Sequence, residues 1–91
     1  MTTTVNEQLV AIRTDLSALL SGVERSNVRD MRDVLRVAFN RVAPDMSSFT
    51  ATWVASMLRD TAVLAGYGGE KNLAVRLHDA AHALDNAWDG F

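Results

Sequence analysis

The sequence predicts an all-α fold: a small antiparallel, up-and-down four-helix bundle, with a homodimer as the alternative way to complete its core. In four stretches, apolar residues recur at alternating spacings of three and four, the period of a helix packed lengthwise on its neighbours. The segments between these stretches are short, which favours antiparallel neighbours. At 91 residues the chain is a single helical domain, 1–91, large enough to enclose a core without disulfides.

The first expected helix begins at Thr3 or Thr4 and ends near Gly22. Thr4 followed by Glu7 matches a capping box, in which each side chain accepts a hydrogen bond from a backbone N–H of the first turn. The apolar repeat of this helix consists of Val5, Leu9, Ile12, Leu16, Leu19 and Val23.

The second expected helix begins after Ser26 and Asn27, which can cap it, and ends at Pro44, which cannot continue a helix. Asp30 lies in its first turn, where a carboxylate favours the positive end of the helix dipole. The apolar repeat of this helix consists of Val28, Met31, Leu35, Ala38 and Val42.

The third expected helix begins at Asp45, Ser47 or Ser48 and ends at about Gly66, where glycine fits a left-handed C-terminal cap. Residues 66–69, with the sequence Gly-Tyr-Gly-Gly, form the expected loop.

The fourth expected helix begins around Glu70, whose charge suits a first turn, and continues to the last few residues. Its apolar repeat consists of Leu73, Leu77, Ala80, Leu84, Ala87 and Phe91. Taken together, the repeats predict a core that includes Leu16, Leu35, Trp53 and Leu77.

The third expected helix has more apolar surface than one core face needs. Only Arg59 and Asp60 are charged between residues 49 and 65, and a turn of about 100° per residue divides the apolar residues between two faces. One face consists of Phe49, Trp53, Met57 and Leu64, and the second of Ala51, Val54, Leu58, Ala62 and Ala65. Either the helix is central and both faces are core, or the second face, with Val54 and Leu58, is a homodimer or partner interface.

A row of arginines lies along one flank of the second expected helix, over about 16 Å. The row consists of Arg25, Arg29, Arg32 and Arg36. Like charges at these spacings repel one another, so helix stability alone does not favour them. Four explanations remain: acidic residues such as Asp15 or Asp60 pair with the row, water solvates it, an acidic protein binds it, or a phosphate backbone binds it. The phosphate backbone ranks below the acidic protein because no aromatic residue accompanies the row to stack on bases.

The fourth expected helix carries polar residues on one side, at spacings of four, three and four. They are His78, His82, Asp85 and Asp89. Two histidines four residues apart can bind one metal ion, and a carboxylate one turn later can supply a third ligand. The alternative is a solvated polar flank without a ligand.

The segment 81–84, Ala-His-Ala-Leu, resembles the Ala-His-x-Leu core of histidine phosphotransfer domains. That resemblance implies a helical bundle in which His82 carries the phosphoryl group.

Composition limits the classes of partner and compartment. The net charge is −2 and the pI about 5.5, so no overall field attracts nucleic acid or an anionic membrane. Cysteine is absent, which excludes thiol redox chemistry and thiolate metal sites. The N-terminal residues do not read as a signal peptide, so we expect a cytoplasmic protein. Arginine outnumbers lysine eight to one, which is typical of GC-rich bacterial or phage coding sequences.

No motif for catalysis or cofactor binding is present, so we expect neither an enzyme nor a bound cofactor. The predicted function is that of a non-catalytic protein-binding module, such as a small adaptor, regulator or inhibitor, that docks through a helical surface. The predicted docking residues are Arg25, Arg29, Arg32, Arg36, Val54 and Leu58. We expect a protein partner with an acidic surface, with a second copy of the chain as an alternative, and no membrane. The alternative functions are phosphotransfer or metal binding through His82 and His78, and nucleic-acid binding through the arginine row.

Overall fold

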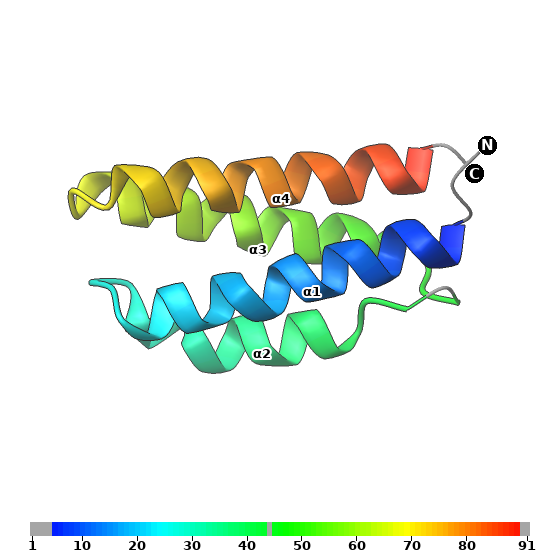
Figure 1. The fold of residues 1–91 in the computed structure, drawn as a ribbon, viewed down its shortest axis with the longest axis horizontal. Coiled ribbons are helices and arrows are strands. Elements are labelled where there is room, and N and C mark those ends of the chain that lie inside the picture. Colours follow the sequence, from blue (N-terminus) through cyan, green and yellow to red (C-terminus); the bar gives the residue numbers. More distant parts are fainter. Residues whose placement is uncertain (1–4, 44, 90–91) are drawn as a thin grey trace.

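The computed structural model of the protein describes residues 5–43 and 45–89, apart from the side chains of residues 5, 6, 8 and 87–89. Its elements, in order, are α1 (Val5–Glu24), the short 3-10 helix η1 (Arg29–Met31), α2 (Arg32–Asn40), α3 (Ser48–Tyr67) and α4 (Lys71–Asp89). These ranges contain no strand, and the helices pack as a bundle (Figure 1). The all-α prediction is therefore confirmed.

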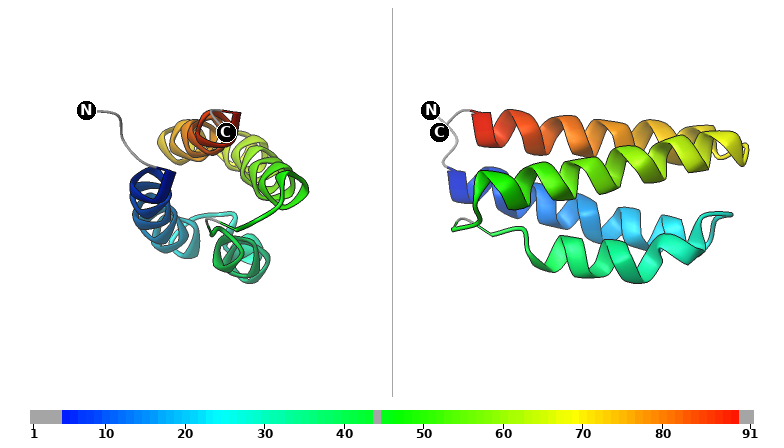
Figure 2. Two further views of the ribbon diagram at one scale, coloured as in Figure 1. Left: turned by 90° about the vertical axis from the view of Figure 1, so that its right-hand side faces the viewer. Right: turned by 180° about the vertical axis from the view of Figure 1, so that it is seen from behind.

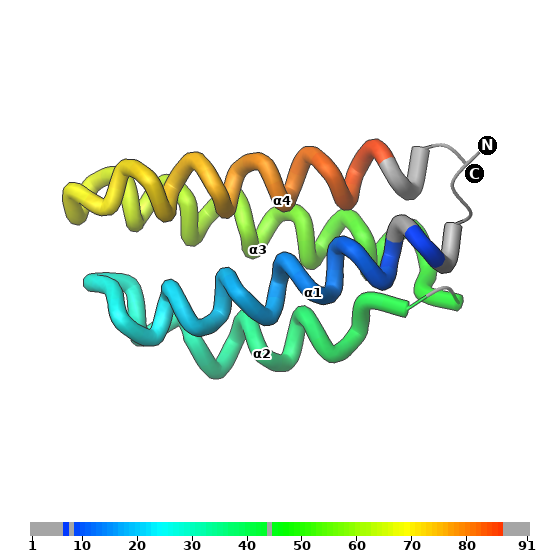
Figure 3. The backbone as a smooth tube through the Cα atoms, in the orientation of Figure 1, coloured from blue at the N-terminus to red at the C-terminus, as the bar shows by residue number. Residues whose placement is uncertain are grey.

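The four α-helices lie around one common core (Figure 2). Helix α4 packs on α3 and α1, and α2 packs on α1 and α3. The chain can be followed by its colours from α1 through α2 and α3 to α4 (Figures 1 and 3). Helix α2 has only nine residues, and the irregular segment after it completes that side of the bundle by burying Val42 and Met46.

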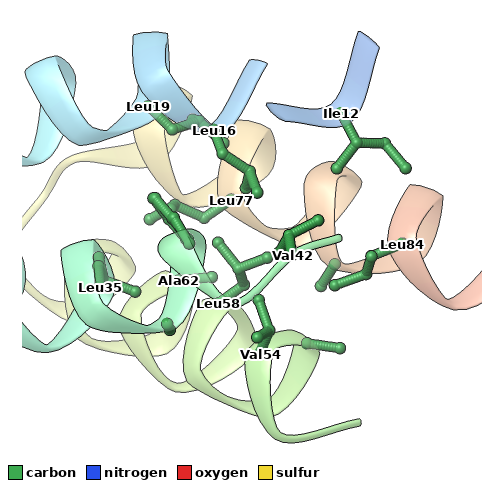
Figure 4. Packing of buried hydrophobic residues seen from close by; sticks show 14 of the residues in the cluster. Ile12, Leu16, Leu19, Leu35, Val42, Val54, Leu58, Ala62, Leu77 and Leu84 are labelled. Carbon is green, nitrogen blue, oxygen red and sulfur yellow. The ribbon is translucent and has the colours of Figure 1, made fainter. Parts of the chain in front are cut away.

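The core is made mainly of leucine, valine and alanine side chains from all four helices (Figure 4). Leu16, Leu35 and Leu77 are almost completely shielded from water, which confirms their predicted core positions. Trp53, also predicted as a core residue, is only half-buried and packs at the edge of this cluster. The hydroxyl of the buried Thr61 donates a hydrogen bond to the carbonyl of Met57 at 2.8 Å, which satisfies it.

The buried face of α3 is the one that contains Val54 and Leu58, both 0% exposed. The predicted partner interface at these two residues is therefore wrong for this fold, because neither side chain reaches the surface. The other apolar face is covered only in part, because Trp53 and Met57 pack against the core cluster whereas Phe49 is 82% exposed and Leu64 is 48% exposed. The sequence correctly indicates that α3 has two apolar faces, but the neighbouring helices cover the face that is rich in alanine.

The ends of α3 follow two standard capping arrangements. Its N-cap is Ser47, as expected, and the Ser47 Oγ accepts a hydrogen bond from the N–H of Thr50 at 3.1 Å. At the other end, the residue with a left-handed backbone is Gly69, with φ of 84°, and not Gly66, which remains helical. The N–H of Glu70 donates to the carbonyl of Ala65 at 2.8 Å, and the N–H of Gly69 donates to that of Gly66 at 3.1 Å. These two bonds form a Schellman motif, which only glycine accommodates without strain at position 69.

Other predicted boundaries are shifted by a few residues. Helix α1 continues to Glu24, two residues beyond Gly22, and α4 begins at Lys71. Helix α2 ends at Asn40, before the predicted stop at Pro44. Pro44 itself and the predicted caps Thr3 and Thr4 lie outside the described residues.

The buried leucines give a direct test of the core. Leu16→Ala and Leu77→Ala should each lower the free energy of unfolding by about 2 to 5 kcal/mol, because each leaves a cavity among packed side chains. Urea denaturation followed by circular dichroism measures this change. Val10→Ala on the exposed side of α1 is the matched control and should cost less than about 0.5 kcal/mol. A loss below about 1 kcal/mol at both leucines would contradict the assigned core.

Candidate functional site

The turn between α1 and η1 carries the first predicted docking residues, and Ser26 holds it in shape. Ser26 is buried, and its Oγ donates to the carbonyl of Val23 at 2.8 Å and accepts from the N–H of Val28 at 3.1 Å. The residues at the N-caps of η1 and α2 make no side-chain capping bond. Ser26 therefore closes the turn after α1, and its predicted role as a cap of the following helix is wrong.

Asn27 joins this turn to the loop between α3 and α4. Its side-chain Nδ2 donates to the carbonyl of Gly68 at 3.0 Å, and its backbone N–H donates to Oε1 of Glu70 at 3.4 Å. The predicted helix-capping role of Asn27 is therefore wrong. Because Asn27 directly precedes Val28 and η1, these bonds fix where the arginine-bearing segment leaves the turn.

The four predicted arginines lie on three successive structural elements and not on one continuous helix. Arg25 lies in the turn, Arg29 in η1, and Arg32 and Arg36 one helical turn apart on α2. The expected straight row over one helix is thus wrong, because the chain forms a turn and a 3-10 helix before the α-helix begins. All four side chains are exposed, and we call these four residues the arginine surface.

Two members of the arginine surface form ion pairs. Nη2 of Arg36 lies 3.1 Å from Oε1 of Glu24, and Nε of Arg32 lies 3.4 Å from Oδ1 of Asp33. Both pairs are exposed to water, so each stabilises the fold by less than about 1 kcal/mol. Among the described residues, Arg25 and Arg29 have no ion-pair partner, and the expected partners Asp15 and Asp60 pair with none of the four.

Exposed aliphatic side chains also lie on α2. Val34 is 42% exposed and Val37 is 52% exposed, and the two are three residues apart along the helix, which places them on the same side. At about 100° per residue, this side is the flank of α2 that faces away from Arg32 and Arg36. The sequence analysis missed the two valines because neither belongs to the apolar repeat of the helix.

The charge of the chain is unevenly distributed. Residues 24–41 contain five arginines and three acidic residues, a net charge of +2, whereas the rest of the chain contains four basic and eight acidic residues, a net charge of −4. Helix α2 does not pack against α4, which carries the acidic residues Asp79 and Asp85 (Figure 2). The arginine surface therefore lies on the positive side of a chain that is acidic overall.

The histidines of α4 do not form a metal site with other described residues. His78 and His82 are exposed, and no group of three or more His, Asp or Glu side chains is close enough to hold an ion within the described part of the chain. Asp85, a predicted third ligand, forms an ion pair with Arg59 of α3. Asp89 has no described side chain. The metal-binding alternative therefore gains no support, and phosphotransfer through His82 stays a prediction.

The surface hollows beside α4 are open grooves between helices. The groove between α3 and α4 has a volume of about 490 Å³, and its polar lining residues are Arg59, His78 and Asp79. The groove between α1 and α4 is smaller, about 330 Å³, and is lined by three alanines and Leu19 together with Asp15, Arg76 and Asp79.

Comparison of the chain with protein-family models, with curated proteins and with solved structures finds no match. The function is therefore argued from the chain's own residues. Within the described ranges, no helix has both the length and the apolar content needed to cross a lipid bilayer.

The role assigned to Ser26 can be tested by removing its hydroxyl. Ser26→Ala should lower the free energy of unfolding by about 1 to 2 kcal/mol, because a buried backbone N–H loses its acceptor. Thermal or urea unfolding measures the loss. Ser21→Ala is the matched control, since the Ser21 hydroxyl is exposed and lies 3.5 Å from its acceptor on Ser17. Equal stability of the two variants would contradict a structural role for Ser26.

Proposed function

We propose that this protein is a non-catalytic protein-binding module, a small adaptor, regulator or inhibitor, that docks through the arginine surface, with the exposed valines on the other flank of α2 as a second contact. The observation that carries this proposal is the exposure of four guanidinium groups, two of which have no ion-pair partner among the described residues. Val34 and Val37 add apolar area that a partner can cover.

The partner that fits this surface is an acidic protein segment. A planar guanidinium donates two parallel hydrogen bonds to one carboxylate, a geometry that selects carboxylates over neutral groups. The net charge of +2 on residues 24–41 attracts an acidic partner, and the net charge of −4 elsewhere repels it from other faces. Electrostatics therefore supports both the location and the sign of the partner.

Nucleic acid fits the same surface less well. The overall charge of −2 opposes long-range attraction of a polyanion. In addition, the aromatic residue of α2, Phe39, is buried and cannot stack on bases. We therefore keep nucleic acid as the alternative that the salt dependence of binding tests.

The proposal takes the bundle as up-and-down and antiparallel. In that topology the turn at residues 25–28 and the loop at residues 68–70 share one end of the molecule, which agrees with the hydrogen bond between Asn27 and Gly68. The arginine surface then runs from this end along α2, on one exposed side of the bundle.

Reversing two charges tests the docking surface. In the double variant Arg29→Glu and Arg32→Glu, the melting curve should stay close to that of the wild type, because both side chains are exposed. Affinity for protein partners isolated from the native host should fall by at least about 100-fold, since attraction is replaced by repulsion. Titration calorimetry with each isolated partner measures this.

The matched control reverses two exposed charges on α4, Lys71→Glu and Arg76→Glu, and should bind as the wild type does. Unchanged binding of the double variant at residues 29 and 32 would contradict the proposed surface. A nucleic-acid partner would show itself by a log-log salt slope that falls by about one for each phosphate-contacting arginine removed.

A further inference from the structure

The outward side of α3 carries a second unpartnered surface, separate from the arginine surface. Its residues recur at spacings of four, three, four, three and four, which is the spacing of a coiled-coil seam. We call this set the α3 seam: Phe49, Trp53, Ser56, Asp60, Val63 and Tyr67. Its exposed members face away from the core, whereas Trp53 is half-buried and packs at the edge of the core cluster.

Much of the α3 seam is apolar surface left in water. Phe49 is 82% exposed, Tyr67 is 87% exposed and Val63 is 56% exposed, and Leu64 beside them is 48% exposed. At about 200 Å² for an aromatic side chain, Phe49 and Tyr67 alone expose roughly 300 to 350 Å². With the two aliphatic residues the exposed apolar area is several hundred Å², divided between the two ends of the seam because Phe49 and Tyr67 lie about 27 Å apart along α3.

The α3 seam is symmetric about position 58. Phe49 and Tyr67 lie nine residues on either side of it, Trp53 and Val63 five, and Ser56 and Asp60 two. When two copies of α3 lie antiparallel across a two-fold axis at this position, each member faces its counterpart in the other copy. The layers are then Phe49 on Tyr67, Trp53 on Val63, and Ser56 on Asp60.

The polar pair at the centre fixes one register. Ser56 and Asp60 are both exposed, and within the described residues neither side chain has a hydrogen-bond partner. In the symmetric register the hydroxyl of Ser56 donates to the carboxylate of Asp60 in the second copy, and the same bond forms twice. A shift by one layer would place Asp60 against Trp53 in one direction and against Asp60 of the second copy in the other, which buries a charge without a partner or opposes two like charges, and both are strongly unfavourable.

We propose that a second copy of this chain docks on the α3 seam, antiparallel and across a two-fold axis at Leu58. The seam is short, and its apolar area corresponds to the low end of protein interfaces, below about 600 Å² per partner. The dimer is therefore weak, with a dissociation constant in the micromolar range, ~1 to 100 μM. This inference does not depend on the arginine surface.

Cross-linking between introduced cysteines tests the orientation. Because the chain has no native cysteine, no other thiol can form a disulfide with them. Phe49→Cys and Tyr67→Cys are prepared as separate single variants and mixed at 100 μM under mild oxidation. In the antiparallel dimer the mixture should form a covalent heterodimer, while each variant alone should not, because its two cysteines lie about 27 Å apart along the helix. Cross-linking of either variant with itself, as a parallel pair would give, overturns the proposed orientation.

Sedimentation equilibrium from 1 μM to 1 mM tests the association itself. The double variant Phe49→Ser and Tyr67→Ser should remain folded, since both side chains are exposed, and should dimerise at least tenfold more weakly than the wild type. The matched control, Val10→Ser and Val75→Ser, removes exposed apolar residues from α1 and α4 and should dimerise as the wild type does. A wild type that stays monomeric at 1 mM, or equal weakening by the control, overturns the proposal.

Discussion

The close packing of α3 on α4 is the interaction on which the rest of the structure depends. The buried face of α3 contains Ala55, Ala62 and Ala65, small side chains that let the two helix axes approach closely. The approach continues to the end of the pair, where a Cβ added at Gly66 would lie 3.9 Å from the Cβ of Ala74. The ion pair between Arg59 and Asp85 links the two helices further along. This pair of helices forms a rigid half of the bundle against which α1 and α2 are placed.

The arginine surface takes its position from that half of the molecule. The Schellman motif at Gly69 sets the course of the loop after α3, and the carbonyl of Gly68 in this loop accepts the hydrogen bond from Asn27. Ser26 fixes the same turn from the side of α1. The arginines at 25 and 29 are thus exposed side chains on a backbone that is held at two points, which lowers the entropy lost when a partner orders them.

The sequence predicts the helices well because each needs only one apolar stripe, and such a stripe repeats over several turns. It places the N-cap of α3 among Asp45, Ser47 and Ser48, because each of these side chains can accept a hydrogen bond from the first turn, and the structure selects Ser47. The end of α3 was harder to place, because three glycines lie within residues 66–69 and only the backbone angle distinguishes the left-handed one. The extent of α2 is likewise not local, since η1 follows Asn27, which is bound by the loop after α3.

The choice between the two faces of α3 could not be made from the hydrophobic period alone. Both faces satisfy that period, and the neighbouring helices decide which one is covered. A usable signal was present in residue size, because the covered face combines alanines with Val54 and Leu58, whereas the free face carries Phe49 and Trp53. Small side chains permit close helix packing, and aromatic ones at an exposed seam supply the large contact areas typical of interfaces. The symmetric spacing of the α3 seam belongs to the exposed face alone. The apolar period of the whole helix therefore does not reveal it.

Taken together, the two proposed surfaces have a consequence that neither has alone. Helix α2 packs beside α3, so a dimer formed across the α3 seam carries two arginine surfaces related by the same two-fold axis. A partner with two acidic segments can then bind both, and the second contact forms at the effective concentration set by the dimer, without new contacts at either surface. Because the proposed dimer is weak, a partner that binds both copies also stabilises the dimer. The two equilibria are linked, so the affinity for a partner with two acidic segments rises with the concentration of this chain.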